Sequence, residues 1–143
     1  MAPFGAQAAD IVGKARVVNG HTLDVAGVIV GLYGIQAPHP DQACQTRHGK
    51  AQSCGRLSMQ SLFLMVRGPA VRCEPQRVTQ DGRTEALCFT SWLNINEEMV
   101  LTGQALADPE TGADFVRAQN FAKAREEGVW QTTFTVPWEW REE

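Results

Sequence analysis

The sequence predicts one small domain in which three helices pack around a five-stranded β-barrel. The chain has 143 residues, 43% of them hydrophobic and 20% charged, and a globular chain of this length buries about two thirds of the surface that it exposes when unfolded. Short runs rich in β-branched residues form two groups, with three runs in the first quarter of the chain and two between the first and second predicted helices. Segments with helical periodicity follow each group. This order of elements is typical of a small barrel with helices on its outside.

Alternating residues and turn residues predict the first group of strands. The three strands are expected over Ile11 to Val18, Thr22 to Val25 and Val28 to Ile35. Asn19-Gly20 is a strong hairpin signal between the first two strands, and Gly27 separates the second strand from the third. The segment from Gln36 to Thr46, which contains Pro38 and Pro40, is expected to be a loop.

Apolar residues spaced three or four positions apart predict three helices. The helices are expected over His48 to Val66, from Asn94 or Asn96 to Leu101, and roughly over Ala113 to Glu127. One face of the first helix is expected to consist of Ala51, Cys54, Ser58, Leu62 and Met65, and one face of the last of Phe115, Ala118, Ala122 and Arg125. Gly68-Pro69, Gly103 and Gly128 mark the three ends. Together with the strands, these helices predict a barrel of the OB type.

Two of the four cysteines are expected to face each other across a hairpin. Cys73 and Cys88 lie in apolar runs on either side of a turn-forming Asp-Gly pair. If Thr79 to Gly82 forms the connection, the two cysteines are directly opposite, with Cβ atoms about 4.5 to 5.5 Å apart, and a disulfide closes with little movement. Cys44 and Cys54 would then pair with each other. Two disulfides indicate an oxidising compartment, and four buried reduced thiols are the alternative.

The two ends of the chain carry further signals. Ala6-Gln7-Ala8 has the small-x-small pattern that signal peptidase cleaves. We expect residues 1–9 to be the remainder of an export signal, with an Ala-rich flexible terminus as the alternative. One domain is expected over residues 10–131, followed by a Trp-rich tail over residues 132–143 whose tryptophans dock on a core. The cleavage pattern and the cysteines together predict a periplasmic or secreted protein.

Charge and hydropathy exclude two classes of partner. Thirteen Lys and Arg against sixteen Asp and Glu give a net charge of -3, whereas proteins that grip nucleic acid without sequence specificity usually carry a basic excess. Strong nonspecific nucleic-acid binding is therefore not expected. The longest apolar stretch, Leu62 to Val66, is far shorter than the roughly 20 residues that cross a bilayer, so no membrane span is expected.

Six short motifs, in order, resemble those of the staphylococcal nuclease (thermonuclease) family. They are Asn19-Gly20-His21-Thr22, Gly31 to His39, His48-Gly49-Lys50-Ala51, Gln80-Asp81-Gly82-Arg83, Gly103 to Ala107, and the Ala-rich last helix that runs to Trp130. The resemblance covers about residues 10 to 131. The cysteine placement and the closing Pro137-Trp138-Glu139-Trp140-Arg141 resemble an exported bacterial branch with two disulfides. The resemblance implies an OB barrel of five strands with three helices.

The resemblance also implies a degenerate active site. The family holds Ca²⁺ with two aspartates and a carbonyl, activates water with a glutamate and binds phosphate with two arginines. At the matching positions this chain has His21 and Gln36 for the aspartates, His39 for the glutamate and Gly31 for the first arginine, and only Arg83 is retained. Ca²⁺ prefers six to eight oxygen ligands, including carboxylates. Neither calcium binding nor any other cofactor is therefore expected.

Two hypotheses remain for these residues. In the first, a transition-metal site for Zn²⁺ or Cu²⁺ consists of His21, Gln36 and His39, because imidazole prefers such ions. In the second, the two histidines are loop residues left after catalysis was lost. Arg83 binds an anionic ligand, or it pairs with Glu74 or Glu85.

The function that we expect is an exported binding or interaction module that has lost phosphodiesterase activity. Its partner would be a protein, an oligosaccharide or a nucleotide, since OB barrels bind such ligands on one face. The alternative is a divergent nuclease that uses Arg83 and His39, with or without a transition metal.

Overall fold

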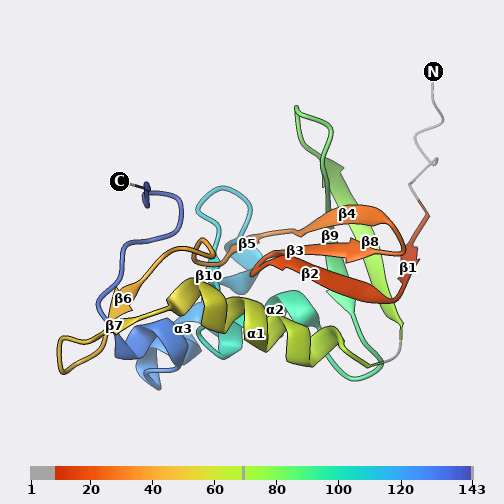
Figure 1. Ribbon diagram of the computed structural model, residues 1–143. Helices are drawn as coiled ribbons and strands as arrows, with labels where there is room; N and C mark the ends of the chain where they lie inside the picture. Colours follow the sequence, from red (N-terminus) through yellow and green to blue (C-terminus); the bar gives the residue numbers. More distant parts are fainter. Residues whose placement is uncertain (1–8, 69, 143) are drawn as a thin grey trace.

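The computed structural model describes residues 9–68 and 70–142 (Figure 1), so the predicted export segment up to residue 8 lies outside the described residues. The main sheet contains β1 (Ile11–Gly13), β2 (Ala15–Asn19), β3 (Thr22–Val25), β4 (Val28–Leu32), β8 (Val71–Val78) and β9 (Thr84–Phe89). Two further ladders pair β5 (Ile35–Gln36) with β10 (Leu106–Ala107), and β6 (Cys44–Gln45) with β7 (Ala51–Gln52).

The main sheet curls into a barrel-like core because its two outermost strands are neighbours in the chain. The order of strands is β1-β8-β9-β4-β3-β2. Lys14 separates β1, which pairs with β8, from β2, which pairs with β3. The single strand predicted from Ile11 to Val18 is therefore divided between the two ends of the sheet. The predicted barrel with three helices is confirmed.

The third strand is shorter than predicted, and this matters for the site. β4 ends at Leu32 and not at Ile35, because Gly34 adopts a left-handed backbone conformation with φ of 82°. A Cβ atom at Gly34 would also lie 2.6 Å from the Phe115 ring. The turn directs β5 away from the main sheet, where it pairs with β10.

The β8–β9 hairpin carries one of the two disulfides. Cys73 pairs with Cys88 in register and is bonded to it, with the two Cα atoms 4.0 Å apart. The connection has five residues and not the four predicted, since Val78 pairs with Thr84. A bulge at Gln76, between Pro75 and Arg77, restores the register. Cys44 and Cys54 form the second disulfide, so both predicted pairings are confirmed.

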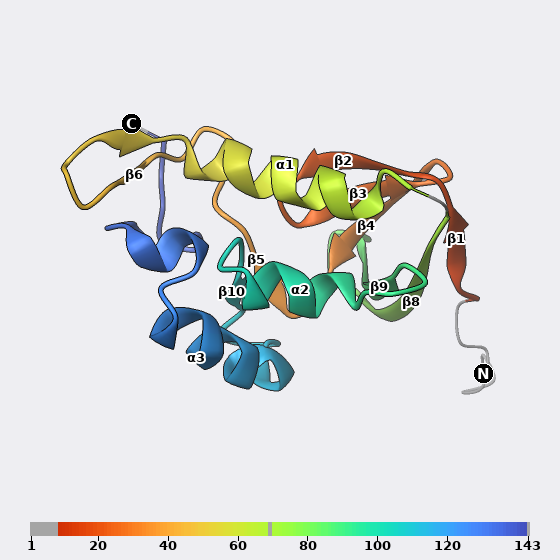
Figure 2. The same ribbon diagram turned by 90° about the horizontal axis from the view of Figure 1, so that it is seen from below.

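Three helices lie together beneath the barrel in Figure 1, and Figure 2 shows them from below. They are α1 (Cys54–Val66), α2 (Ile95–Leu101) and α3 (Val116–Ala124), with short 3-10 turns η1 (Ala113–Phe115) and η2 (Gly128–Gln131) around the last. α1 begins six residues later than predicted, because Ala51 lies in β7. Asn94 caps α2 by accepting a hydrogen bond from the Glu97 amide.

The last helix is also shorter than predicted. α3 ends at Ala124 and Glu126 has a positive φ of 54°, so Arg125 lies beyond the helix and is exposed instead of joining the buried face. Gly128 begins η2 and is not the immediate cap of α3.

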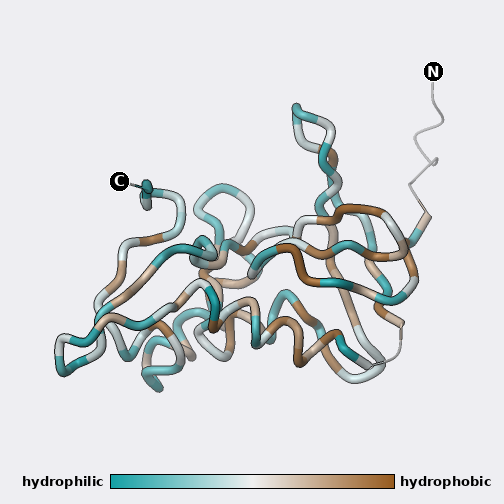
Figure 3. The backbone as a smooth tube through the Cα atoms, in the orientation of Figure 1, coloured by the Kyte–Doolittle hydropathy of each residue, from teal (hydrophilic) through white to brown (hydrophobic). Residues whose placement is uncertain are grey.

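Two apolar clusters form the interior. The larger one fills the barrel and the space between the barrel and the helices, and Figure 3 shows hydrophobic stretches along the strands and helices but a hydrophilic β8–β9 tip. The smaller cluster contains the Cys44–Cys54 pair, Leu106 and Val129. Phe134, Val136 and Trp138 from the C-terminal tail pack against it, so this tail is docked on a core as expected. None of the helices in the described part of the chain is long and apolar enough to cross a membrane.

Candidate functional site

A small cleft of about 150 Å³ collects the polar residues singled out from the sequence. His21 enters it from the β2–β3 turn, Gln36 from β5 and Arg83 from the residue before β9. Two carboxylates that the sequence analysis did not select also line it, Glu85 from β9 and Asp108 from the residue after β10. The β5–β10 ladder places Leu106 opposite Gln36, which brings Asp108 beside it.

His21 is held as a neutral imidazole. Burial, and next the positive charge of Arg83, lower the pKa of His21 to about 4. Its Nδ1 accepts a hydrogen bond of 2.8 Å from the Ala37 amide, and its own amide donates to Asn19 Oδ1. Because a neutral imidazole that accepts at Nδ1 carries its proton on Nε2, His21 has an N–H donor at its remaining ring nitrogen.

The two carboxylates of the cleft already take part in hydrogen bonds or an ion pair. Asp108 Oδ2 accepts a hydrogen bond of 2.6 Å from Gln36 Nε2, and its Oδ1 accepts from the amides of Glu110 and Thr111. Burial opposes ionisation of Asp108, but these hydrogen bonds outweigh it and leave the pKa below its ordinary value. Glu85 forms an ion pair with Arg77, at 2.6 Å.

The wall of the cleft carries a positive charge, the guanidinium of Arg83. Within residues 9–68 and 70–142, Arg83 has no ion-pair partner within 4.0 Å, and the two acids weighed as its partners pair elsewhere: Glu85 with Arg77 and Glu74 with Arg72. The pairing of Arg83 with Glu74 or Glu85 is therefore not formed. The Arg83 amide donates to Thr79 Oγ1, which fixes the backbone but leaves the guanidinium free to meet a ligand.

A second hollow, a groove of about 250 Å³, shares His21 and Gln36 with the cleft and extends to the C-terminal tail. His39 lines this groove but not the cleft, and its ring stacks on Trp140 with centroids 4.8 Å apart. Like His21, His39 accepts an amide hydrogen bond at Nδ1, here from Asp41 at 3.0 Å. The structure thus brings His21, Gln36 and His39 to one groove, and it places His39 and Arg83 in adjoining hollows.

Neither hollow has the donor set that calcium prefers. The two positions that match the family's aspartates offer an imidazole and an amide, and Asp108 and Glu85 are hydrogen-bonded or ion-paired. Among the described residues, no three His, Cys, Asp or Glu side chains come together as they would to hold a metal ion. Zn²⁺ or Cu²⁺ at either Nε2 would require the ring proton to move and the Nδ1 hydrogen bond to break. Binding of such an ion stays a prediction.

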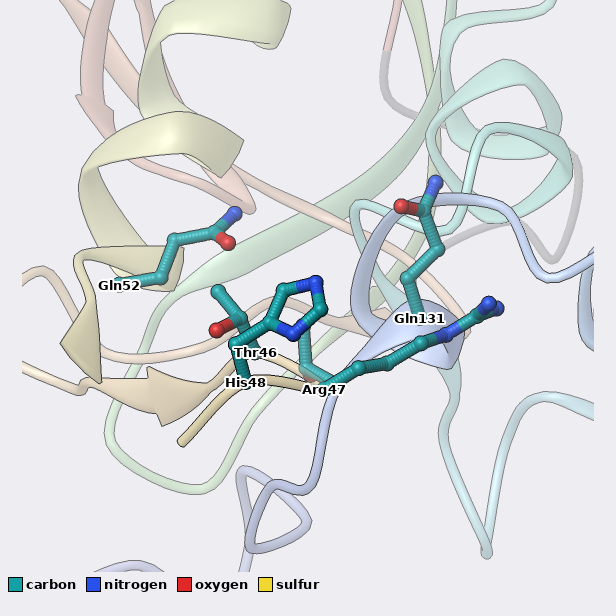
Figure 4. Close-up of a pocket in the computed structure, with 6 residues that line it drawn as sticks. Thr46, Arg47, His48, Gln52 and Gln131 are labelled. Carbon is teal, nitrogen blue, oxygen red and sulfur yellow. The ribbon is translucent and has the colours of Figure 1, made fainter. Parts of the chain in front are cut away.

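A third hollow, of about 240 Å³, lies apart from this pair and shares no lining residue with them. Gln52, His48 and Gln131 contribute to it from β7, the β6–β7 turn and η2 (Figure 4). Arg47, also on its rim, is paired with Glu126 at 2.8 Å. Sequence reasoning used His48 only as a possible helix start.

Comparison with known families decides the assignment. The family described as staphylococcal nuclease homologue matches residues 29–132, which include Gly31, Gln36, His39 and Arg83. The chain belongs to the staphylococcal nuclease family. This staphylococcal nuclease homologue is also 31% identical, over 125 residues, to the succinoglycan biosynthesis protein ExoI of Rhizobium meliloti (strain 1021). The aligned segment covers 85% of this chain and 65% of ExoI, so the chain spans less than two thirds of that relative.

Proposed function

We propose that this staphylococcal nuclease homologue is an exported binding module that has lost calcium-dependent phosphodiesterase activity. The observation that carries the proposal is the state of the cleft. His21 and Gln36 stand at the positions that match the family's metal carboxylates, and Asp108, the nearest acid to Gln36, is bound to it. Losing the general base alone costs about 10² to 10⁴ in rate, and the metal ligands are missing as well.

The same cleft is suited to an anion. Arg83 supplies a guanidinium without an ion-pair partner among the described residues, and His21 supplies an Nε2–H donor. Charge-assisted hydrogen bonds from such donors favour a carboxylate or a phosphate group. Arg77 and Glu85 cancel each other and Asp108 adds a negative charge that is bound to Gln36, so the attraction comes from Arg83 alone and does not extend to a polyanion.

The disulfides and the relative support the proposed cellular setting. Two disulfides favour an oxidising compartment, which supports a periplasmic or secreted location. ExoI is named as a succinoglycan biosynthesis protein. This relative supports the proposal that the chain acts in the handling of a polysaccharide and not in the digestion of nucleic acid.

The rival function is a divergent phosphodiesterase that uses Arg83 and His39. It requires one substrate to reach both hollows, since Arg83 lines the cleft and His39 lines the groove. It also requires His39 to act as a base while its ring is stacked on Trp140.

One assay separates the two functions. The protein is incubated with single- and double-stranded DNA and RNA in the presence of Ca²⁺, Mg²⁺, Mn²⁺ or Zn²⁺, with Arg83→Ala and His39→Ala variants alongside. We expect no turnover above that of the variants. Turnover that either substitution abolishes would overturn the binding-module proposal.

A second experiment tests whether the cleft binds an anion. Binding of inorganic phosphate, followed by the NMR shifts of the His21 ring, is expected to weaken in Arg83→Ala. It is not expected to weaken in a control, Arg56→Ala, since Arg56 lies on α1 and lines neither hollow.

A further inference from the structure

The groove between His39 and the C-terminal tail is a built feature of the fold. Gln42 is 1% exposed, and its amide holds both walls at once. Its Nε2 donates to the Thr135 carbonyl at 2.6 Å, and its Oε1 accepts from the His39 amide at 3.2 Å. Gln45 and Thr133 exchange two backbone hydrogen bonds of 2.9 Å. The tail is therefore fixed beside His39 before any ligand arrives, which lowers the entropic cost of binding.

The lining of the groove combines flat apolar surfaces with hydrogen-bond donors and hydrogen-bond acceptors. Trp140, Pro137 and Pro40 supply the flat surfaces, and one face of the Trp140 indole is covered by the His39 ring, which leaves the opposite face for a ligand. Asn19 uses its Oδ1 on the His21 amide and Gln36 uses its Nε2 on Asp108. Within the described residues, the Asn19 Nδ2 donor and the Gln36 Oε1 acceptor form no hydrogen bond, and both residues line the groove with His39.

This combination matches a sugar ring better than a nucleotide. A pyranose has an apolar C–H face that lies against an indole, and its hydroxyls both donate and accept hydrogen bonds. A strand of nucleic acid would bring one phosphate for each base and would need several cations along its path. The groove instead has Arg141 beside Glu142, and the chain has a net charge of -3.

The groove adjoins the cleft proposed to bind an anion, since His21 and Gln36 line both. A ligand that occupies the two hollows together therefore carries a flat polyhydroxylated ring at Trp140 and an acidic group at Arg83. We infer that this groove is the ring-binding subsite for an acidic oligosaccharide, with Trp140 as its stacking surface. The inference rests on the proposed binding function and names its ligand class.

The test uses aldotriouronic acid, which carries one carboxylate on three sugar rings, as the acidic probe, maltotriose as the neutral probe and a thymidine pentanucleotide as the polyanion. Affinities are measured by isothermal titration on the full chain. We expect aldotriouronic acid to bind most tightly, Trp140→Ala to weaken its binding about tenfold, which corresponds to about 1.4 kcal/mol, and Trp140→Phe to retain most of it. Trp92→Ala is the matched control, because Trp92 is 92% exposed and lines neither hollow.

The outcomes separate the inference from the proposed function. Two results overturn the inference: an affinity for aldotriouronic acid that is the same in Trp140→Ala as in the wild type, or no binding of it at millimolar concentration. The proposed function is kept in either case if phosphate binding still depends on Arg83. Tighter binding of the pentanucleotide also overturns the inference. Cleavage of nucleic acid overturns the proposed function itself. If Trp140→Ala loosens the tail, the melting temperature of that variant falls, and Trp140→Phe is then compared with the wild type in its place. A more than fivefold loss of affinity in Trp140→Phe would contradict stacking on Trp140.

Discussion

Replacing His21 with glutamine tests whether the cleft holds a neutral imidazole. The pKa of His21 in the folded protein is about 4, chiefly because of burial and then because of Arg83, whereas an exposed histidine in the unfolded chain has a pKa of about 6.5. As the pH falls, the unfolded chain therefore takes up this proton first. The contribution of His21 to stability is complete above the unfolded pKa and is lost as the pH falls through 6.5 toward 4.

The size of this effect follows from the two pKa values. Between pH 7.5 and pH 5, the free energy of unfolding is expected to fall by about 2 kcal/mol because of His21 alone. Carboxylates with lowered pKa values, such as Asp108, also stabilise the fold, but their contribution to the free energy of unfolding is lost only at more acidic pH and changes little in this window. Glutamine at position 21 keeps a hydrogen-bond acceptor for the Ala37 amide but does not titrate.

Urea unfolding of the wild type, His21→Gln and His48→Gln at pH 7.5, 6 and 5 provides the measurement. His48 is the matched control because it is exposed in the β6–β7 turn. The wild type and His48→Gln are expected to lose stability together, and His21→Gln is expected to lose about 2 kcal/mol less. If His21→Gln follows the same pH dependence as the wild type, His21 is not held neutral and the description of the cleft is wrong.

Three further predictions concern the metal, the core and the tail. Addition of about 10 mM Ca²⁺ is expected to raise the melting temperature by less than about 2 °C, since a ligand stabilises only as far as it binds the folded state; a larger, saturable increase would reveal a calcium site. Asn96→Ala is expected to cost about 2 to 4 kcal/mol in urea unfolding, because the fully buried Asn96 side chain bonds the Cys88 amide and the Ala86 carbonyl. The cap variant Asn94→Ala is expected to cost only about 1 kcal/mol, and equal costs would contradict the role of Asn96. Gln42→Ala is expected to speed amide hydrogen exchange in the tail, measured by mass spectrometry, whereas the exposed Gln76→Ala leaves it unchanged; unchanged exchange in Gln42→Ala would mean that the tail is held by other contacts.

The features that the sequence predicted well are those set by neighbouring residues. Alternation and the Asp-Gly turn were enough to place Cys73 opposite Cys88, although the bulge at Gln76 and the fifth loop residue could not be foreseen. The sequence offered Asn94 or Asn96 as the cap, and Asn94 is the one that caps α2, through a bond that joins residues three apart. The start of α1 was predicted too early, because the periodicity of Ala51 fits a helix as well as it fits the edge of β7.

The composition of the cleft could not be predicted in full, because it depends on contacts between distant segments. Asp108 reaches Gln36 across 72 positions of sequence, and only the β5–β10 ladder brings the two together. Glu85 was weighed only as a partner for Arg83, but its neighbour across the hairpin, Arg77, takes that place. The choice between the two arginines depends on side-chain direction across paired strands, which alternation in the sequence does not specify.

Arg83 connects the binding site to the protonation state of His21. Burial is the larger cause of the low pKa of His21, and the charge of Arg83 is the second. An anion bound at Arg83 cancels that charge, so it raises the pKa of His21 while burial still keeps it below that of a free histidine. Because the coupling is reciprocal, a protonated His21 must in turn strengthen anion binding. The affinity for sulfate, whose charge does not change over this range, is therefore expected to rise as the pH falls toward 4 in the wild type and to lose this dependence in His21→Gln, which a calcium-dependent nuclease site built on carboxylates would not do.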